Sequence, residues 1–255
     1  MTMKSYVRSG GLYVPVSQLH VKQGGTWKKV SKGYVKQGGA WKQFHESTKY
    51  AVEYLGPPIV DTAGRSTYTF ATTGFGSPDS TREIFIVGRA RHSSSSGNIS
   101  AMTIGGVAAT ISSSVSTTSC EFCGFAPVPT GPNGTVVVTL GNTHQFCMIA
   151  VYRVTKRPVG GARTDAELGQ LFSGTSLTIN SVTIDANGFM LGAHGHANAN
   201  PTTSSVLTTD ADLSPVAGVR NWFGHMEIQP GAITPSQQWS WSGNAAAMGT
   251  LWAFK

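Results

Sequence analysis

The sequence predicts an all-β protein, and three observations lead to this class. The 255-residue chain contains 31 Gly with many Ser and Thr, and only 12 Asp and Glu, a composition that favours short strands and frequent turns. Short apolar or β-branched runs alternate with turn clusters along the chain. The N-terminal segment of the chain contains a repeat built around Gly-Gly pairs. We therefore expect N-terminal β-hairpin repeats followed by an antiparallel β-sandwich, jelly-roll-like and pseudo-duplicated.

Three copies of a fourteen-residue phrase form the N-terminal repeat. They read YVRSGGLYVPVSQL from Tyr6, HVKQGGTWKKVSKG from His20 and YVKQGGAWKQFHES from Tyr34. In each copy a Gly-Gly pair, which can adopt the positive φ angles of a type I′ turn, separates two extended runs. Each copy is therefore predicted to be a hairpin.

The hairpin register places a cation opposite an aromatic residue in every copy. The predicted pairs are Arg8 with Tyr13, Lys22 with Trp27, and Lys36 with Trp41. Such cross-strand pairs contribute roughly 0.2–1 kcal/mol each, so the cations can simply cover the rings. A hairpin has little core of its own, however, and its aromatic residues need cover from the main domain or from a foreign surface. We predict that these six residues form a docking segment.

The net charge of +7 is concentrated in this segment. Residues 1–45 hold eight Lys and Arg and no acid, whereas the remainder holds eleven basic and twelve acidic residues. Basic residues interleaved with aromatics are also typical of nucleic-acid binding. The lysines are spread evenly rather than focused in a groove, so nucleic acid is not the favoured partner.

The remainder of the chain is expected to contain many short strands and one short helix. The helix is predicted at Thr164–Phe172, where Thr-Asp-Ala-Glu resembles a cap. The predicted strands are Thr67–Phe70, Glu83–Arg91, Ala101–Ile104, Ala108–Ser112, Cys120–Ala126, Thr135–Leu140, Phe146–Val154, Ser176–Ile184, Gly188–His196, Trp222–Ile228, Gln238–Ser242 and Gly249–Phe254.

A second repeat, with an offset of about one hundred residues, is visible in the remainder. Phe85–His92 resembles Phe189–His196, Cys123–Gly131 resembles Phe223–Gly231, and a third match follows in the same order. We expect a repeat segment at 1–46 and a sandwich domain at 47–255, made of two related halves at about 60–156 and 174–255.

Several polar residues have the spacing of candidate metal ligands. Cys120, Cys123, His144 and Cys147 have the CxxC and HxxC spacing that zinc sites use. Residues three apart on a strand point to opposite faces, so free thiols in the core or at the surface are the alternative that we favour. His194 and His196 lie on one strand face, and Asp210 and Asp212 lie in a Thr-rich loop. Neither pair completes a ligand set, and we predict no metal and no cofactor.

No motif of a known catalytic class is present. The sequence contains no G-x-S-x-G elbow, phosphate-binding loop or dinucleotide fingerprint, and we predict that the protein is not an enzyme. Trp239 and Trp241 lie on one strand face, where they either stack on a sugar or pack into the core. No signal peptide and no apolar stretch of about 18 residues is recognisable, so no membrane is expected, and three cysteines suit synthesis in a reducing cytosol.

The tandem YVKxGGxWK phrases resemble N-terminal segments of tailed-bacteriophage virion proteins of the tail fibre, spike or decoration type. Met102–Thr110 and Val128–Val154 resemble a β-sandwich module of phage and prophage virion proteins. The resemblance implies a structural virion component made in the host cytoplasm. Its partners would be other virion proteins, copies of itself as a trimer by analogy, and host surface polysaccharide. A capsid decoration protein and a carbohydrate-binding module are the alternatives.

Overall fold

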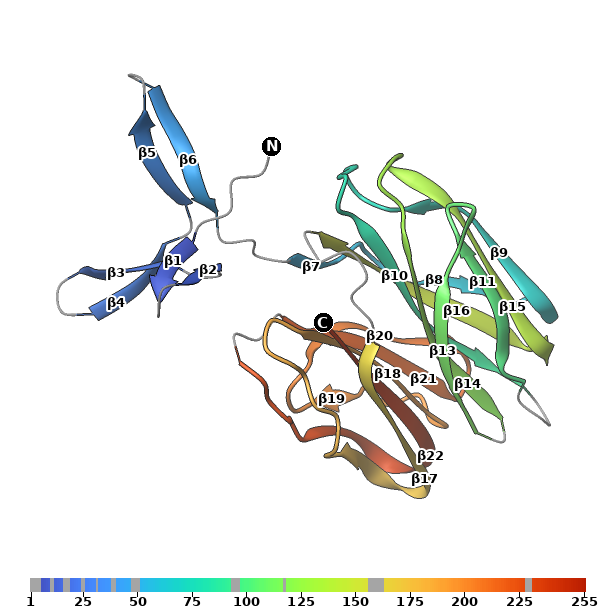
Figure 1. Cartoon of the computed structure of the whole chain (residues 1–255). Coiled ribbons are helices and arrows are strands. Elements are labelled where there is room, and N and C mark those ends of the chain that lie inside the picture. The colour runs from blue at the N-terminus through green and yellow to red at the C-terminus, as the bar shows by residue number, and fades with distance from the viewer. Residues whose placement is uncertain are drawn as a thin grey trace. The chain divides into compact units, whose positions relative to one another are not determined.

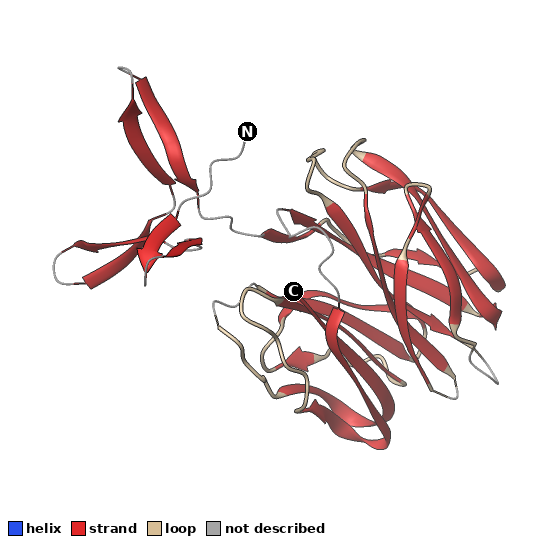
Figure 2. Cartoon of the chain, in the orientation of Figure 1, coloured by secondary structure: helices blue, strands red, loops and turns tan. Residues whose placement is uncertain are grey.

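A computed structural model describes most of the chain as two compact units, Met1–Lys49 and Tyr50–Lys255. The described residues are 6–9, 12–15, 19–23, 26–30, 32–37, 40–46, 51–92, 97–116, 118–155, 163–227 and 231–255. Their regular structure is entirely β, with antiparallel strand pairs throughout (Figures 1 and 2). In the described part of the chain there is no helix long and apolar enough to cross a membrane.

The first unit contains three two-stranded antiparallel sheets, one for each copy of the repeat. Extended runs on either side of each Gly-Gly pair therefore form hairpin strands, as the sequence predicts. The strands are β1 (Tyr6–Ser9), β2 (Leu12–Pro15), β3 (Leu19–Gln23), β4 (Thr26–Val30), β5 (Lys32–Gln37) and β6 (Ala40–Glu46).

The second unit contains three sheets. The outer sheet has the order β12-β11-β15-β9, from β9 (Arg65–Gly74), β11 (Ile99–Ile104), β12 (Val107–Ala108) and β15 (Asn133–His144). The central sheet has the order β13-β14-β10-β16-β7, with β8 also on β16. Its strands are β7 (Ala51–Tyr54), β8 (Ile59–Asp61), β10 (Glu83–Arg91), β13 (Thr110–Val115), β14 (Ser119–Pro127) and β16 (Phe146–Thr155).

The third, C-terminal sheet has the order β17-β22-β18-β21-β20, with the short β19 also on β22. Its strands are β17 (Arg163–Ile179), β18 (Phe189–His196), β19 (Thr203–Ser204), β20 (Thr208–Val216), β21 (Val219–Met226) and β22 (Gln237–Phe254). The central and C-terminal sheets share one arrangement of strands: β10 lies between the later strands β14 and β16, and β18 lies between the later strands β21 and β22.

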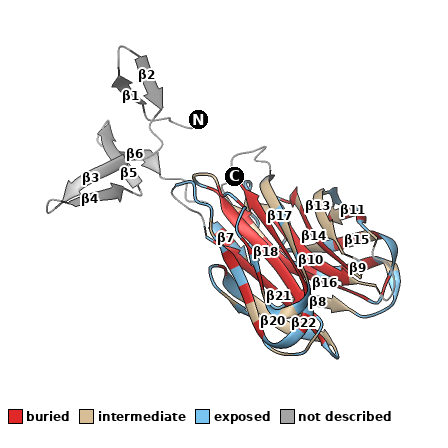
Figure 3. Ribbon diagram, turned by 90° about the horizontal axis from the view of Figure 1, so that it is seen from below, coloured by how far each residue is buried: buried red, intermediate tan, exposed pale blue. Residues whose placement is uncertain are grey.

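The central sheet is buried on both faces, which explains why its strands are apolar without alternation. Along β10, Ile84 and Ile86 pack with the outer sheet, whereas Phe85 and Val87 pack with the C-terminal sheet. Buried residues accordingly run through the middle of the unit in Figure 3. The predicted all-β sandwich class is confirmed, and the second unit is a stack of three sheets with two apolar interfaces.

The predicted helix at Thr164–Phe172 is wrong, because this segment is part of β17. Its residues pair with β22, from Arg163 opposite Phe254 to Leu171 opposite Ala247. Asp165 does not cap a helix; its side chain accepts hydrogen bonds from the backbone of Ala166 and Thr183, each at 2.8 Å. Strand pairing therefore overrides the local capping pattern.

The long β17 and β22 strands fold back together over the far face of the C-terminal sheet. Their register shifts between Leu171 and Ser176, where the ribbon bends. Beyond the bend, Leu177 and Trp239 return to pack over Gly249, where an added Cβ would lie 2.7 Å from the Trp239 ring. This fold encloses a third apolar cluster and places the bend beside the end of the central sheet.

Candidate functional site

The predicted docking pairs of the N-terminal unit are present in the backbone register. The paired residues are Arg8 with Tyr13, Lys22 with Trp27, and Lys36 with Trp41. Each pair occupies the same position in its hairpin, so the fourteen-residue repeat of the sequence is also a repeat of strand register.

The cysteines are distributed over the two faces of the central sheet. Cys120 and Cys147 both lie beside Ala90 and pack toward the outer sheet, whereas Cys123 packs toward the C-terminal sheet. All three are buried free thiols. Burial raises the pKa of Cys120 to about 12 and the pKa of Cys147 well above its ordinary value. The three thiols therefore cannot converge on one ion.

His144, the one histidine of the zinc-like spacing, contacts groups other than the cysteines. His144 meets the His92 ring edge-on at 5.5 Å between centroids, and its Nδ1 lies 2.8 Å from the carbonyl oxygen of Asn142. Among the residues that the structure describes, no group of three His, Cys, Asp or Glu side chains is placed to hold a metal ion.

Trp239 and Trp241 are buried, so they do not form an exposed sugar-stacking platform. Trp239 stacks on His194 with ring centroids 5.0 Å apart, and Trp241 stacks on His196 at 4.8 Å. Burial, with Arg89 nearby, lowers the pKa of His194 well below its ordinary value and that of His196 to about 4. The two histidines are therefore neutral near pH 7 and act as flat core side chains.

Asp210 and Asp212 lie on strand β20 rather than in a loop, and both already have protein partners. Asp210 Oδ2 accepts a hydrogen bond from the Tyr152 hydroxyl and lies 2.8 Å from His225 Nδ1. Asp212 is paired with Arg220, which donates from Nε at 2.8 Å. The two carboxylates thus serve separate contacts and do not share a cation.

The most unusual polar group of the second unit is Arg89, which is buried between the central and C-terminal sheets. Its Nη1 donates to Asn221 Oδ1 at 2.9 Å and its Nη2 donates to Ser119 Oγ at 3.0 Å. Its Nε lies 3.9 Å from Glu121 Oε1 and has no hydrogen-bond acceptor. Neutral acceptors therefore make all the hydrogen bonds of this buried cation.

Glu121 compensates the charge of Arg89 only in part. The carboxyl is fully buried and accepts a hydrogen bond from Thr250 Oγ1 at 2.7 Å. Burial raises its pKa to about 7, although Arg89 and Thr250 act in the opposite direction. Burial therefore weakens the negative charge that this carboxyl offers to Arg89.

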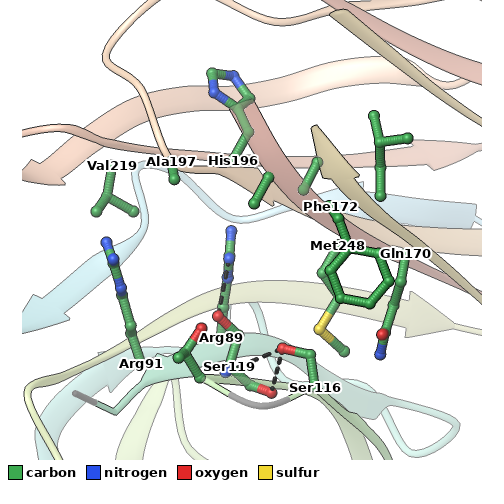
Figure 4. A pocket seen from close by; sticks show the side chains of 14 residues that line it. Arg89, Arg91, Ser116, Ser119, Gln170, Phe172, His196, Ala197, Val219 and Met248 are labelled. Carbon is green, nitrogen blue, oxygen red and sulfur yellow. Dashed lines mark hydrogen bonds between the residues drawn. The ribbon is translucent and has the colours of Figure 1, made fainter. Parts of the chain in front are cut away.

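A cleft of about 90 Å³ opens at this end of the two sheets. Arg89, Arg91 and Ser119 line it from the central sheet, and Gln170, Phe172 and His196 line it from the C-terminal sheet. Figure 4 shows Arg89 and Arg91 extending side by side toward the C-terminal sheet. None of the described residues that line it is acidic. The arrangement can bind an anion, and we treat this cleft as the candidate functional site of the second unit.

The sequence did not point to this cleft because its residues come from distant strands. Arg89 and Asn221 are separated by 132 positions. The available signals were an arginine inside the apolar run of β10 and a glycine between two histidines. An added Cβ at Gly195 would lie 0.8 Å from Arg89 Nη1, so this glycine provides the space for the guanidinium.

No protein-family model matches this chain, and no curated protein or solved structure matches it either.

Proposed function

We propose that the protein is a structural component of a tailed-phage particle, docked through its N-terminal hairpins and displaying its second unit as a tail fibre, tip or spike. The observation that supports this most directly is the cation–aromatic register, which recurs in three consecutive hairpins. The resemblance of the YVKxGGxWK phrases to virion proteins supports the same function.

The physical argument starts from the size of each hairpin. Two strands of four to seven residues cannot bury much apolar surface by themselves. The repeat nevertheless keeps Tyr13, Trp27 and Trp41 at equivalent positions, and aromatic residues are enriched at protein interfaces. A periodic row of such positions suits contact with other virion proteins, which we propose as the partners of this unit.

The second unit supports the display part of the proposal. Its cores are contained within its own three sheets, so it can stand at a particle surface without a partner sheet. We further propose that the protein acts as a homo-oligomer, a trimer by analogy with phage fibres, and that it contacts host surface polysaccharide. A capsid decoration role is the second reading of the same features.

The docking role is tested by replacing Trp27 and Trp41 together with Ala in the full chain. We expect the variant to stay soluble but to be lost from assembled particles, because two of three aromatic interface positions are removed. Incorporation is measured by quantifying the protein in purified particles. The matched control is Lys28→Ala with Lys42→Ala, which changes the position after each Trp and removes two charges.

The outcomes separate the docking role from its alternatives. Normal incorporation of the Trp variant would reject docking through these residues. If only the Lys variant loses incorporation, and the repeat binds DNA in a salt-dependent manner, nucleic acid would be the partner instead. Imaging particles labelled at the C-terminus distinguishes a tail position from capsid decoration.

A further inference from the structure

We propose that the cleft beside Arg89 and Arg91 binds the acidic group of a sugar unit, whose ring lies against Phe172. The proposal deepens the display function, because it assigns a ligand class to the exposed unit. Its binding test uses the purified protein and does not depend on particle assembly.

The charge of the cleft favours an anion. Arg89 and Arg91 are two apart on β10 and therefore share the face that points into the cleft (Figure 4). Arg89 donates its hydrogen bonds to neutral oxygens, and Glu121, whose Oε1 lies 3.9 Å from Arg89 Nε, is not among the described residues that line the cleft. Two guanidinium groups without an acidic neighbour in the lining can donate in pairs to a carboxylate or a phosphate.

The exposed aromatic ring favours a ligand with an apolar face. The side chain of Phe172 is 88 % exposed, although most large apolar residues of the unit are buried. It lies where the register between β17 and β22 shifts, so the backbone bulge turns it away from the core. A sugar ring presents C–H groups on one face, and these can cover such an aromatic ring.

The size of the cleft suits part of a sugar unit. About 90 Å³ is open to water-sized groups, which is enough for the acidic substituent. Phe172 and Gln170 line the cleft on the β17 side, where the sugar ring can rest (Figure 4). Ser119 and Gln170 add neutral polar groups of the kind that pair with sugar hydroxyls. Cation, aromatic ring and neutral polar groups thus match three parts of one acidic sugar.

The test is a calorimetric titration of the full-length protein with each of four probes. These are an oligosaccharide containing glucuronic acid, its carboxyl-reduced neutral form, an oligosaccharide carrying a sugar phosphate, and inorganic phosphate. We expect at least one acidic oligosaccharide to bind at least about tenfold more tightly than the neutral form, because charge-assisted hydrogen bonds are lost with the acid.

Two variants connect this binding to the cleft. Arg91→Gln should weaken binding of the acidic oligosaccharide about tenfold, and Phe172→Ala should weaken it several-fold. Arg65→Gln is the matched control, since Arg65 is a partly exposed arginine on β9 of the outer sheet. It should leave the affinity unchanged. All three side chains are at least partly exposed, so the variants are expected to fold, which a thermal unfolding scan verifies.

Each outcome decides the proposal. Preference for the carboxylate or for the phosphate oligosaccharide supports it and identifies the acid. Equal binding of the neutral form, unchanged affinity in both cleft variants, or no binding of any probe would overturn it. Inorganic phosphate binding as tightly as the sugars would also overturn it, because the ring would then contribute nothing. Both cleft variants should be incorporated into particles normally. Failure of sugar binding and failure of the docking role are therefore separate results.

Discussion

At the scale of single residues, one glycine makes room for the buried cation of the cleft. Arg89 reaches from β10 to the C-terminal sheet and passes over Gly195, at which any side chain would overlap its guanidinium group. The conformation of Gly195 is ordinary for a strand, so space rather than backbone freedom selects glycine here. The hydrogen bonds of Arg89 to Ser119 and Asn221 depend on this gap.

Gly195→Ala should therefore destabilise the protein strongly for so small a change. The added methyl group would displace Arg89 and leave its charge without partners, at a cost of about 3 kcal/mol. For a unit of this size the midpoint of thermal unfolding should fall by roughly 6–12 °C. Gly231→Ala is the control, because an added Cβ there meets nothing within 4 Å. Equal midpoints for the two variants would contradict the placement of Arg89.

At the scale of elements, the strands with long apolar runs were predictable from the sequence, whereas the bent pair of long strands β17 and β22 was not. The predicted strand Glu83–Arg91 coincides with β10, and Phe146–Val154 differs from β16 by one residue. Both strands are buried on two faces, which explains why their sequences are apolar without alternation. The predicted strands at 238–242 and 249–254 are instead two parts of the single strand β22, which continues through the residues between them. Ala245, Ala247 and Met248 of that intervening stretch pair with β17, and the register shifts between Ala245 and Ser240.

The return of this ribbon over the C-terminal sheet depends on Trp239. Its ring is fully buried, stacks on His194 and rests on Gly249. Trp239→Ala should lower the free energy of unfolding by about 3–5 kcal/mol, because the cavity left cannot be refilled by its aromatic neighbours. Urea denaturation measures the difference. The control is Phe172→Ala, which removes an exposed ring from β17 and should leave the free energy of unfolding within about 0.5 kcal/mol of the wild-type value. Similar losses in both variants would show that Trp239 does not close the third apolar cluster.

At the scale of the whole molecule, the candidate site could not be predicted because it belongs to no single segment. Hairpin register follows from neighbouring residues, so the pairs of Lys22 with Trp27 and of Lys36 with Trp41 were correctly derived from the position of Gly-Gly. The cleft depends instead on how the central and C-terminal sheets pack, and that packing is fixed by aromatic contacts such as Phe85 with Phe254, whose centroids are 4.9 Å apart. No local pattern encodes such a contact.

The same interface predicts that the second unit folds as a whole, although β14-β10-β16 and β21-β18-β22 have the same arrangement of strands. Fragments 50–155 and 163–255 would each expose one side of the cluster that contains Phe85, Phe189 and Trp252. We expect each fragment alone to lack a cooperative unfolding transition, because an apolar sheet face of this kind must be covered. Mixing the fragments should restore the transition and shield Trp252 from a fluorescence quencher. The intact 50–255 fragment is the control, and cooperative unfolding of 163–255 by itself would show that the halves are independent domains.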